Sequence, residues 1–163
     1  MSIAVLSIGS NLGDRRAAVQ GALDAFRPWL VAVSPVYETP PWGPVPQDDF
    51  LNAVLVASDA QAAPADWLAR AHAAEQASGR TRDVRWGPRT LDVDVIAVDD
   101  VTSDDPALTL PHPHAAERAF VLVPWLAVQP GARLSGRPIR DLLAALAPDA
   151  VAGVRARPEL AVA

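Results

Sequence analysis

Hydrophobic positions along the chain recur with two periods, and these periods predict a series of strands and helices. Four short runs are apolar or alternating, as is typical of strands: residues 3–8, 31–37, 50–58 and 91–98. Two stretches between them carry apolar residues at helical spacing: Val19, Leu23 and Phe26 in the first, and Trp67, Leu68, Ala71 and Ala74 in the second. The predicted order is therefore β-α-β-β-α-β.

This order favours an α+β fold of the ferredoxin-like type, in which an antiparallel sheet carries two helices on one face. A C-terminal extension follows, with a short strand at 108–110, helical structure at 115–128 interrupted at Pro124, and a short helix at 140–146. From about residue 148 the sequence lacks strong periodicity, and we expect a loosely held tail. No linker or internal repeat is evident, so residues 1–163 are expected to form a single domain.

A proline-rich segment at 39–49 separates the second predicted strand from the third. Proline removes a backbone donor and fixes φ, so this segment is expected to be a long loop. Long loops in compact domains are often functional lids. Trp42 favours that interpretation over a rigid connector, because an indole on a loop usually covers something.

Composition narrows the class of protein. The formal net charge of −5 argues against general nucleic-acid binding. No apolar run is long enough to span a bilayer, the N-terminus lacks the features of a signal peptide, and the sequence contains no cysteine. We therefore expect a cytoplasmic protein with no membrane partner. All fourteen basic residues are arginines, which excludes a P-loop lysine.

Four of these arginines lie close together, directly before the last predicted strand. They are Arg80, Arg82, Arg85 and Arg89. Within that strand, Asp92 and Asp94 project from the same face, roughly 7 Å apart along the chain. Carboxylates suit Mg²⁺, and arginine forks suit phosphate oxygens, so the stretch predicts a nucleoside triphosphate bound as its metal complex. The alternative is a solvated Asp pair beside a basic loop.

The stretch RWGPRTLDVDV resembles the signature of the 6-hydroxymethyl-7,8-dihydropterin pyrophosphokinase family. Three further segments resemble that family and follow one another in the family's order: SIGSNLGDR, YETPPWGPVPQDDFLNAV and LTLPHPHAAERAFVLVPW. The likeness runs from Ile3 to about Val128. The resemblance implies a ferredoxin-like enzyme of folate biosynthesis that transfers pyrophosphate from ATP to the hydroxymethyl group of a dihydropterin and releases AMP.

The resemblance also implies roles for individual residues. Asp92 and Asp94 would hold two Mg²⁺ ions, and Arg80 and Arg89 would be catalytic. The implied ATP-binding residues are Glu75, Arg82, Arg85, Val95, Thr109, His112 and Arg118. The implied pterin-binding residues are Thr39, Pro40, Trp42, Gly43, Phe50, Asn52, Trp86 and Phe120.

The pterin set makes chemical sense independently of the resemblance. A flat bicycle with polar edges requires aromatic faces and rim hydrogen bonds, which Phe120 and Asn52 can supply. The alternative for Phe50 and Phe120 is ordinary core packing. A buried Asn52 needs a ligand or a backbone partner in either case, because an unpaired amide is costly.

Two other functions remain open at the level of the sequence. One is a non-catalytic ferredoxin-like module that binds a small molecule or RNA, although the acidic charge and the Asp pair oppose RNA. The other is a phosphotransferase with a different acceptor, which would not require Asn52 and Phe120. We expect a monomer from the family resemblance alone.

Overall fold

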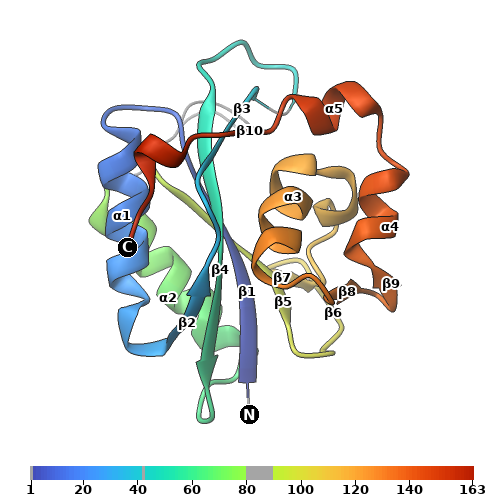
Figure 1. Cartoon of the computed structure of the whole chain (residues 1–163). Helices are drawn as coiled ribbons and strands as arrows, with labels where there is room; N and C mark the ends of the chain where they lie inside the picture. Colours follow the sequence, from blue (N-terminus) through green and yellow to red (C-terminus); the bar gives the residue numbers. More distant parts are fainter. Residues whose placement is uncertain (1, 42, 80–89) are drawn as a thin grey trace.

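The computed structural model describes residues 2–41, 43–79 and 90–163, and its main element is a six-stranded antiparallel sheet (Figure 1). The strands are β1 (Ser2–Ser10), β2 (Leu30–Val33), β3 (Tyr37–Thr39), β4 (Phe50–Asp59), β5 (Asp92–Val98) and β10 (Arg155–Ala156). Their order is β10-β3-β4-β1-β5, and β2 also pairs with β4. The prediction of an antiparallel sheet combined with helices is confirmed.

Two helices cover one face of this sheet, as predicted (Figure 1). They are α1 (Arg15–Ala25) and α2 (Pro64–Ala77). Asp14 caps α1 by accepting a hydrogen bond from the N–H of Ala17 at 3.0 Å. Trp67 is fully buried, and its indole N–H donates to Ser2 Oγ at 2.8 Å, which ties α2 to β1. Every second residue of the strands faces this core, including Leu6, Leu55 and Val95.

The opposite face is covered by the C-terminal extension. Helices α3 (Ala119–Val128) and α4 (Ile139–Ala144) bury a second core that includes Val5, Val54 and Ile96. The expected interruption at Pro124 is not found, since α3 continues through it. A proline inside a helix removes one donor, so the Phe120 carbonyl receives no hydrogen bond from residue 124.

The face beneath α3 changes character along three neighbouring strands. Its apolar part consists of Val5, Val54 and Ile96. Two and four residues further along the same face lie Ser7 and Gly9 on β1, Asn52 and Phe50 on β4, and Asp94 and Asp92 on β5. Helix α3 covers the apolar part, and the polar part remains next to the start of that helix. This division creates the candidate site described below.

Several smaller elements differ from the expected ones. The predicted strand at 31–37 is split into β2 and β3, because Pro35 cannot donate to a ladder and the Ser34 hydroxyl instead accepts from the N–H of Val54 at 2.9 Å. The strand predicted at 108–110 is confirmed as β7 (Leu108–Leu110), paired with β6 (Ser103–Asp105). A hairpin of β8 (Arg133–Leu134) and β9 (Arg137–Pro138) and 3₁₀ turns at Arg27–Trp29, Ala115–Glu117 and Pro158–Leu160 were not predicted.

The expectation of a loosely held tail after residue 148 is wrong. This segment forms α5 (Pro148–Ala152) and then β10, which pairs with β3 at the edge of the sheet. Further along, Arg16 on α1 donates to the carbonyl of Ala161 at 2.9 Å. These contacts are ionic or made by the backbone, so they leave no hydrophobic period in the sequence.

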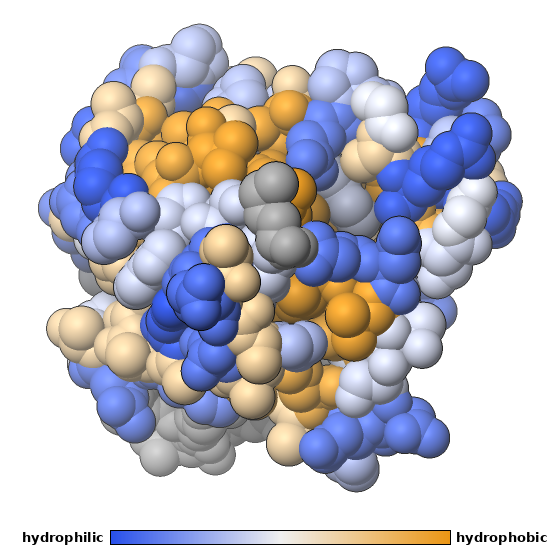
Figure 2. Space-filling model, turned by 90° about the horizontal axis from the view of Figure 1, so that it is seen from below, coloured by the Kyte–Doolittle hydropathy of each residue, from blue (hydrophilic) through white to orange (hydrophobic). Residues whose placement is uncertain are grey.

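The surface carries both polar and apolar areas. Figure 2 shows a face on which apolar residues gather in patches bordered by polar residues. Ile3, Leu12, Val31 and Val101 are the large apolar side chains exposed among the described residues. In the part of the chain that the structure describes, no helix has the length and apolar character needed to cross a bilayer.

Candidate active site

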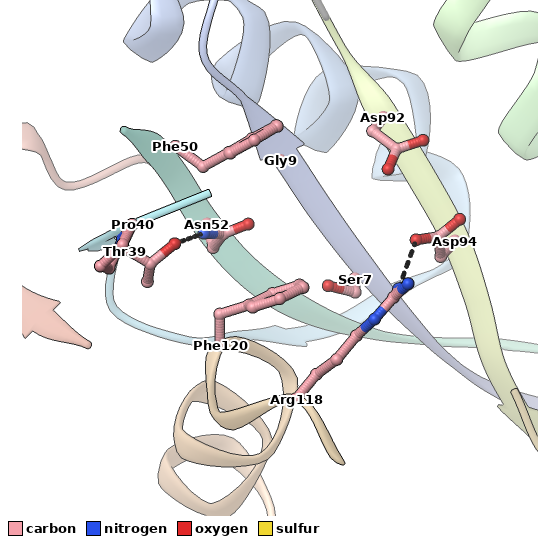
Figure 3. A pocket seen from close by; sticks show the side chains of 10 residues that line it. All are labelled: Ser7, Gly9, Thr39, Pro40, Phe50, Asn52, Asp92, Asp94, Arg118 and Phe120. Atoms are coloured by element: carbon pink, nitrogen blue, oxygen red, sulfur yellow. Dashed lines mark hydrogen bonds and ion pairs between the residues drawn. The ribbon is translucent and has the colours of Figure 1, made fainter. Parts of the chain in front are cut away.

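A pocket lies on the polar part of the second sheet face, at the start of α3 (Figure 3). Four strands, the beginning of the proline-rich loop and the start of α3 contribute to it. Its lining residues are Ser7, Gly9, Thr39, Pro40, Phe50, Asn52, Asp92, Asp94, Arg118 and Phe120. The pocket thus joins residues that are up to 113 positions apart in the sequence, from Ser7 to Phe120.

One end of the pocket is charged. Asp92 and Asp94 on β5 are both half-buried and face the pocket, as their alternation predicted. Arg118, immediately before α3, is 6% exposed, and its Nη1 lies 3.7 Å from Asp94 Oδ2. A buried guanidinium requires nearby anionic or polar groups, so a carboxylate and a cation are held together at this end.

The other end combines aromatic rings with an amide. The Asn52 side chain is 3% exposed, and its Nδ2 donates to Thr39 Oγ1 at 2.5 Å. In the view of Figure 3, the rings of Phe50 and Phe120 lie on opposite sides of Asn52. The Arg118 guanidinium lies 5.6 Å from the centre of the Phe120 ring, so this ring is next to both ends of the pocket.

Gly9 leaves the space that this amide occupies. A Cβ atom at residue 9 would lie 2.8 Å from Asn52 Oδ1 and 3.4 Å from Phe50 Cδ1. The first distance is shorter than a tolerable contact, so a side chain at residue 9 would have to displace Asn52. Ser7 and Gly9 were absent from the predicted site, although their alternation with Val5 was a signal that could have placed them on this face.

The proline-rich loop is attached at its end to the turn that follows β1. Asn11 Nδ2 donates at 2.8 Å both to Gln47 Oε1 and to the carbonyl of Asp48. Arg15 Nη1 donates to the carbonyl of Asp49 at 3.1 Å. Near the middle of the loop, Gly43 has φ of 104°, a conformation that favours glycine. Residues 47–49 of the loop are therefore fixed to the turn after β1 and to α1.

Comparison with known proteins identifies the family. The family model described as 7,8-dihydro-6-hydroxymethylpterin-pyrophosphokinase (HPPK) matches residues 5–130, which include every lining residue of the pocket. The chain belongs to the HPPK family. The family predicted from the sequence motifs is thereby confirmed.

Curated relatives of this pyrophosphokinase family agree over most of their length. The chain is 50% identical over 161 residues to the 2-amino-4-hydroxy-6-hydroxymethyldihydropteridine pyrophosphokinase of Mycobacterium tuberculosis, covering 91% of this chain and 86% of the relative. It is 51% identical over 170 residues to that of Mycobacterium leprae, covering 95% and 88%. It is 43% identical over 155 residues to that of Methylorubrum extorquens, covering 93% and 98%.

Solved structures agree on the fold. A crystal structure of wild-type Plasmodium falciparum HPPK-DHPS matches with a TM-score of 0.66 and 16% identity. The match covers 86% of this chain and 44% of that longer chain. At this identity the likeness supports the shared HPPK fold alone.

The structure brings together many of the residues predicted for HPPK chemistry. The pocket contains Thr39, Pro40, Phe50, Asn52 and Phe120 from the pterin set, Asp92 and Asp94 from the metal set, and Arg118 from the ATP set. Gly43 lies further along the loop and is not among the lining residues. Six predicted positions lie outside the described residues: Trp42, Arg80, Arg82, Arg85, Trp86 and Arg89.

Four residues of the predicted ATP set lie around β5 rather than in the pocket lining. Glu75 is 4% exposed, and its Oε2 accepts a hydrogen bond from the N–H of Val93 at 3.0 Å, between the two aspartates. Val95 points its side chain into the core under α1 and α2. Thr109 Oγ1 donates to the Asp105 carbonyl at 3.1 Å, within the β6–β7 hairpin.

The fourth residue, His112, is held against β5 by its backbone N–H, which donates to the carbonyl of Ile96 at 2.8 Å. Burial, together with the smaller effects of the charges of Arg118 and His114, lowers the pKa of the His112 imidazole to about 4, and the charge of Asp92 partly opposes this shift. The folded chain therefore keeps this imidazole neutral over a pH range in which an unfolded histidine binds a proton.

This difference predicts a pH dependence of stability for the ligand-free chain. The contribution of neutral His112 to the free energy of unfolding is fully present above about pH 6.5. It is lost as the pH falls toward 4, because the unfolded chain then binds a proton at this histidine that the folded chain does not bind. His112→Gln should reduce the loss of unfolding free energy between about pH 7 and pH 4.5 by about 1–2 kcal/mol, allowing for partial exposure. Urea unfolding at about pH 7 and about pH 4.5 measures this change in unfolding free energy for each chain.

His72→Gln is the matched control, because His72 is exposed on α2. That variant should lose as much unfolding free energy as the unsubstituted chain over the same pH range. Equal losses in the His112→Gln variant and the unsubstituted chain would contradict the prediction.

Proposed function

We propose that this chain transfers pyrophosphate from ATP to the hydroxymethyl group of 6-hydroxymethyl-7,8-dihydropterin, releasing AMP, in folate biosynthesis. The observation that carries the proposal is the division of one pocket into a charged end and an aromatic-amide end. A triphosphate needs the first kind of environment, and a flat heterocycle with polar edges needs the second. Family membership supports the same reaction.

The aromatic-amide end suits the pterin. Phe50 and Phe120 offer apolar ring faces, and Asn52 offers an amide for the polar edge of a bicycle. The Asn52–Thr39 hydrogen bond holds that amide in one orientation before the substrate arrives. Leaving a buried amide without a hydrogen-bond partner costs free energy. The site therefore favours acceptors with a complementary polar edge over apolar ones.

The charged end suits a metal-bound triphosphate. No cluster of three or more His, Cys, Asp or Glu side chains suited to a metal occurs in residues 2–41, 43–79 and 90–163. Asp92 and Asp94 offer two carboxylates instead, and a pair of carboxylates completed by substrate phosphates is how Mg²⁺ is commonly bound. The donor set therefore fits Mg²⁺, with Asp92 and Asp94 holding two ions as the family resemblance implies.

In the proposed reaction the acceptor hydroxyl oxygen forms a bond to the β-phosphorus of ATP. The bond between that phosphorus and the oxygen leading to the α-phosphorus breaks, AMP leaves with the electron pair, and the proton of the acceptor hydroxyl is released to water. Bound Mg²⁺ would supply charge neutralisation on the phosphates and a lower pKa for the attacking hydroxyl. Arg118 adds a fixed positive charge beside Asp94, and the pocket walls orient the acceptor.

Several finer assignments belong to the same proposal. Arg80 and Arg89 would bind the transferred phosphates, with Arg82, Arg85, Glu75, Val95, Thr109 and His112 around the nucleotide. Gly43, Trp42 and Trp86 would complete the pterin site. A ferredoxin-like topology is supported by the strand order β3-β4-β1-β5 with α1 and α2 on one face. A single-domain, cytoplasmic monomer remains our prediction.

The test is the identity of the nucleotide product. The chain is incubated with MgATP in the presence and absence of 6-hydroxymethyl-7,8-dihydropterin, and AMP and ADP are separated by chromatography. AMP should form only when the pterin is present. ADP would show an ordinary kinase on this scaffold, and the absence of turnover by folded protein would favour a binding module.

A further inference from the structure

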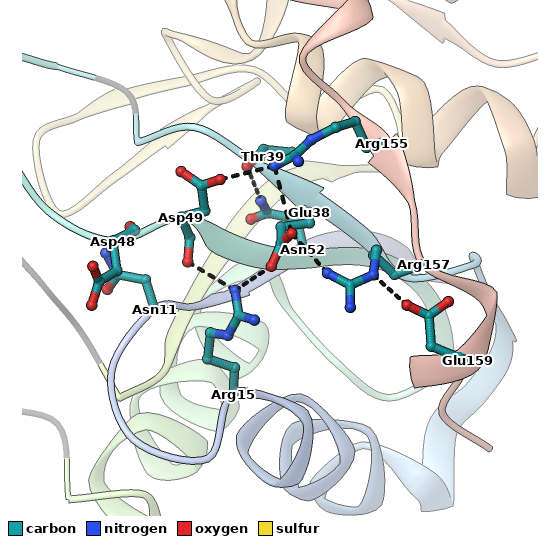
Figure 4. Close-up of polar contacts among 10 residues, drawn as sticks. All are labelled: Asn11, Arg15, Glu38, Thr39, Asp48, Asp49, Asn52, Arg155, Arg157 and Glu159. Atoms are coloured by element: carbon teal, nitrogen blue, oxygen red, sulfur yellow. Dashed lines mark hydrogen bonds and ion pairs between the residues drawn. The ribbon is translucent and has the colours of Figure 1, made fainter.

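The C-terminal segment 148–157 lies against the proline-rich loop, although more than a hundred residues separate them in sequence (Figure 4). β10 pairs with β3, placing Arg155 opposite Glu38 and Ala156 opposite Tyr37. The N–H of Arg157 donates to the carbonyl of Val36 at 2.9 Å. The segment thereby supports the strand that ends at Thr39, the hydrogen-bond partner of Asn52.

This segment touches both ends of the loop 40–49. At the start of the loop, Gly153 packs on Pro40, because a Cβ atom at residue 153 would lie 3.4 Å from Pro40 Cδ. At its end, Arg155 Nη2 donates to Asp49 Oδ2 at 2.8 Å. Pro40 lines the pocket, and Asp49 directly precedes Phe50, which also lines it. The segment therefore contacts the two places where the loop joins the acceptor end.

Glu38 connects these contacts to the rest of the sheet. Its carboxylate accepts from Arg15 at 2.7 Å and from Arg157 at 2.7 Å, and it lies 3.5 Å from Arg155 Nη2. Its side chain is only 13% exposed, and the hydrogen bond from Arg15 lowers its pKa. Arg15 also reaches the Asp49 carbonyl, so the network fixes the loop from two sides (Figure 4).

We propose that Arg155, acting through Asp49 and Glu38, is a positioning residue for the acceptor. It holds the ends of the loop, and with them Pro40 and Phe50, in the arrangement that binds the pterin. Isolated exposed ion pairs contribute little to folding, so the main effect is preorganisation of the site rather than global stability. Among the described residues, the contacts of this network lie at the acceptor end and not on β5. This inference rests on the proposed function.

The experiment compares Arg155→Ala with Arg16→Ala. Both remove an exposed arginine that anchors the C-terminal region, but Arg16 donates to the carbonyl of Ala161, away from the loop. Arg155→Ala should raise KM for the pterin about tenfold, with kcat and KM for ATP within about twofold. Arg16→Ala should leave all three constants unchanged. Arg155→Lys, which retains a cation for Asp49, should have a pterin KM close to that of the unsubstituted chain.

Hydrogen–deuterium exchange provides a readout that does not need turnover. Amides of residues 43–52 should exchange faster in Arg155→Ala and not in Arg16→Ala. An unchanged pterin KM in Arg155→Ala, or equal effects in both variants, would overturn the inference. If the unsubstituted chain shows no AMP formation, the proposed function fails, and exchange alone decides whether Arg155 orders the loop.

Discussion

Replacing Asp94 with alanine should lower kcat by about 10³-fold while the chain remains folded. Asp94 faces the pocket from β5, next to Asp92, and its Oδ2 lies 3.7 Å from the buried Arg118 guanidinium. Without it, one of two carboxylates able to hold Mg²⁺ is gone, and Arg118 loses an anionic neighbour. Both changes weaken charge neutralisation on the phosphates during transfer.

The measurement is steady-state AMP formation at saturating MgATP and pterin, together with a thermal unfolding curve. Asp104→Ala is the matched control, because Asp104 is an exposed strand aspartate on β6. It should retain full turnover. If Asp94→Ala turned over at a rate near that of the unsubstituted chain, the metal role assigned to β5 would be wrong.

Gly9→Ala should raise KM for the pterin by about 10²-fold and leave KM for ATP nearly unchanged. The added methyl group would lie 2.8 Å from Asn52 Oδ1 and 3.4 Å from Phe50 Cδ1. β1 is an interior strand and cannot move aside easily, since β4 and β5 pair with it on both sides. The Asn52 amide must therefore shift and lose its hydrogen bond to Thr39.

Steady-state kinetics with each substrate varied in turn would measure this effect. Gly21→Ala is the matched control, because a Cβ atom there meets nothing within 4 Å on helix α1. It should leave both KM values unchanged and slightly stabilise the helix. Normal pterin KM in Gly9→Ala would show that Asn52 does not set acceptor binding.

Much of the site could be predicted because its signals are local. Alternation along residues 91–98 placed Asp92 and Asp94 on one face, and the structure confirms that placement. An amide within an apolar strand marked Asn52 as a residue that needs a partner; a ligand or backbone partner was predicted, and the structure shows the side-chain hydroxyl of Thr39. These predictions needed only the period of a strand and the chemistry of one side chain.

The parts that were missed depend on contacts between distant segments. Ser7 and Gly9 belong to a site only because β1 lies between β4 and β5, and an apolar run does not reveal its neighbours in a sheet. Residues 148–163 are held by backbone pairing and arginine contacts, and by only two apolar side chains packed on the core, Leu160 and Val162, which are too few to give a hydrophobic period. Helix α3 passes through Pro124 because packing on Val5, Val54 and Ile96 overrides a local preference.

The contacts at the two outer strands also bear on self-association. An unpaired strand edge is a template for growth of a sheet from one molecule into the next. On β5, the N–H of Val93 is taken by Glu75 and the carbonyl of Ile96 by His112. At the opposite side, β3 is covered by β10, whose two residues are too few to recruit another chain readily. These contacts occupy backbone groups on both outer sides of the sheet and thus oppose edge-to-edge association of two chains.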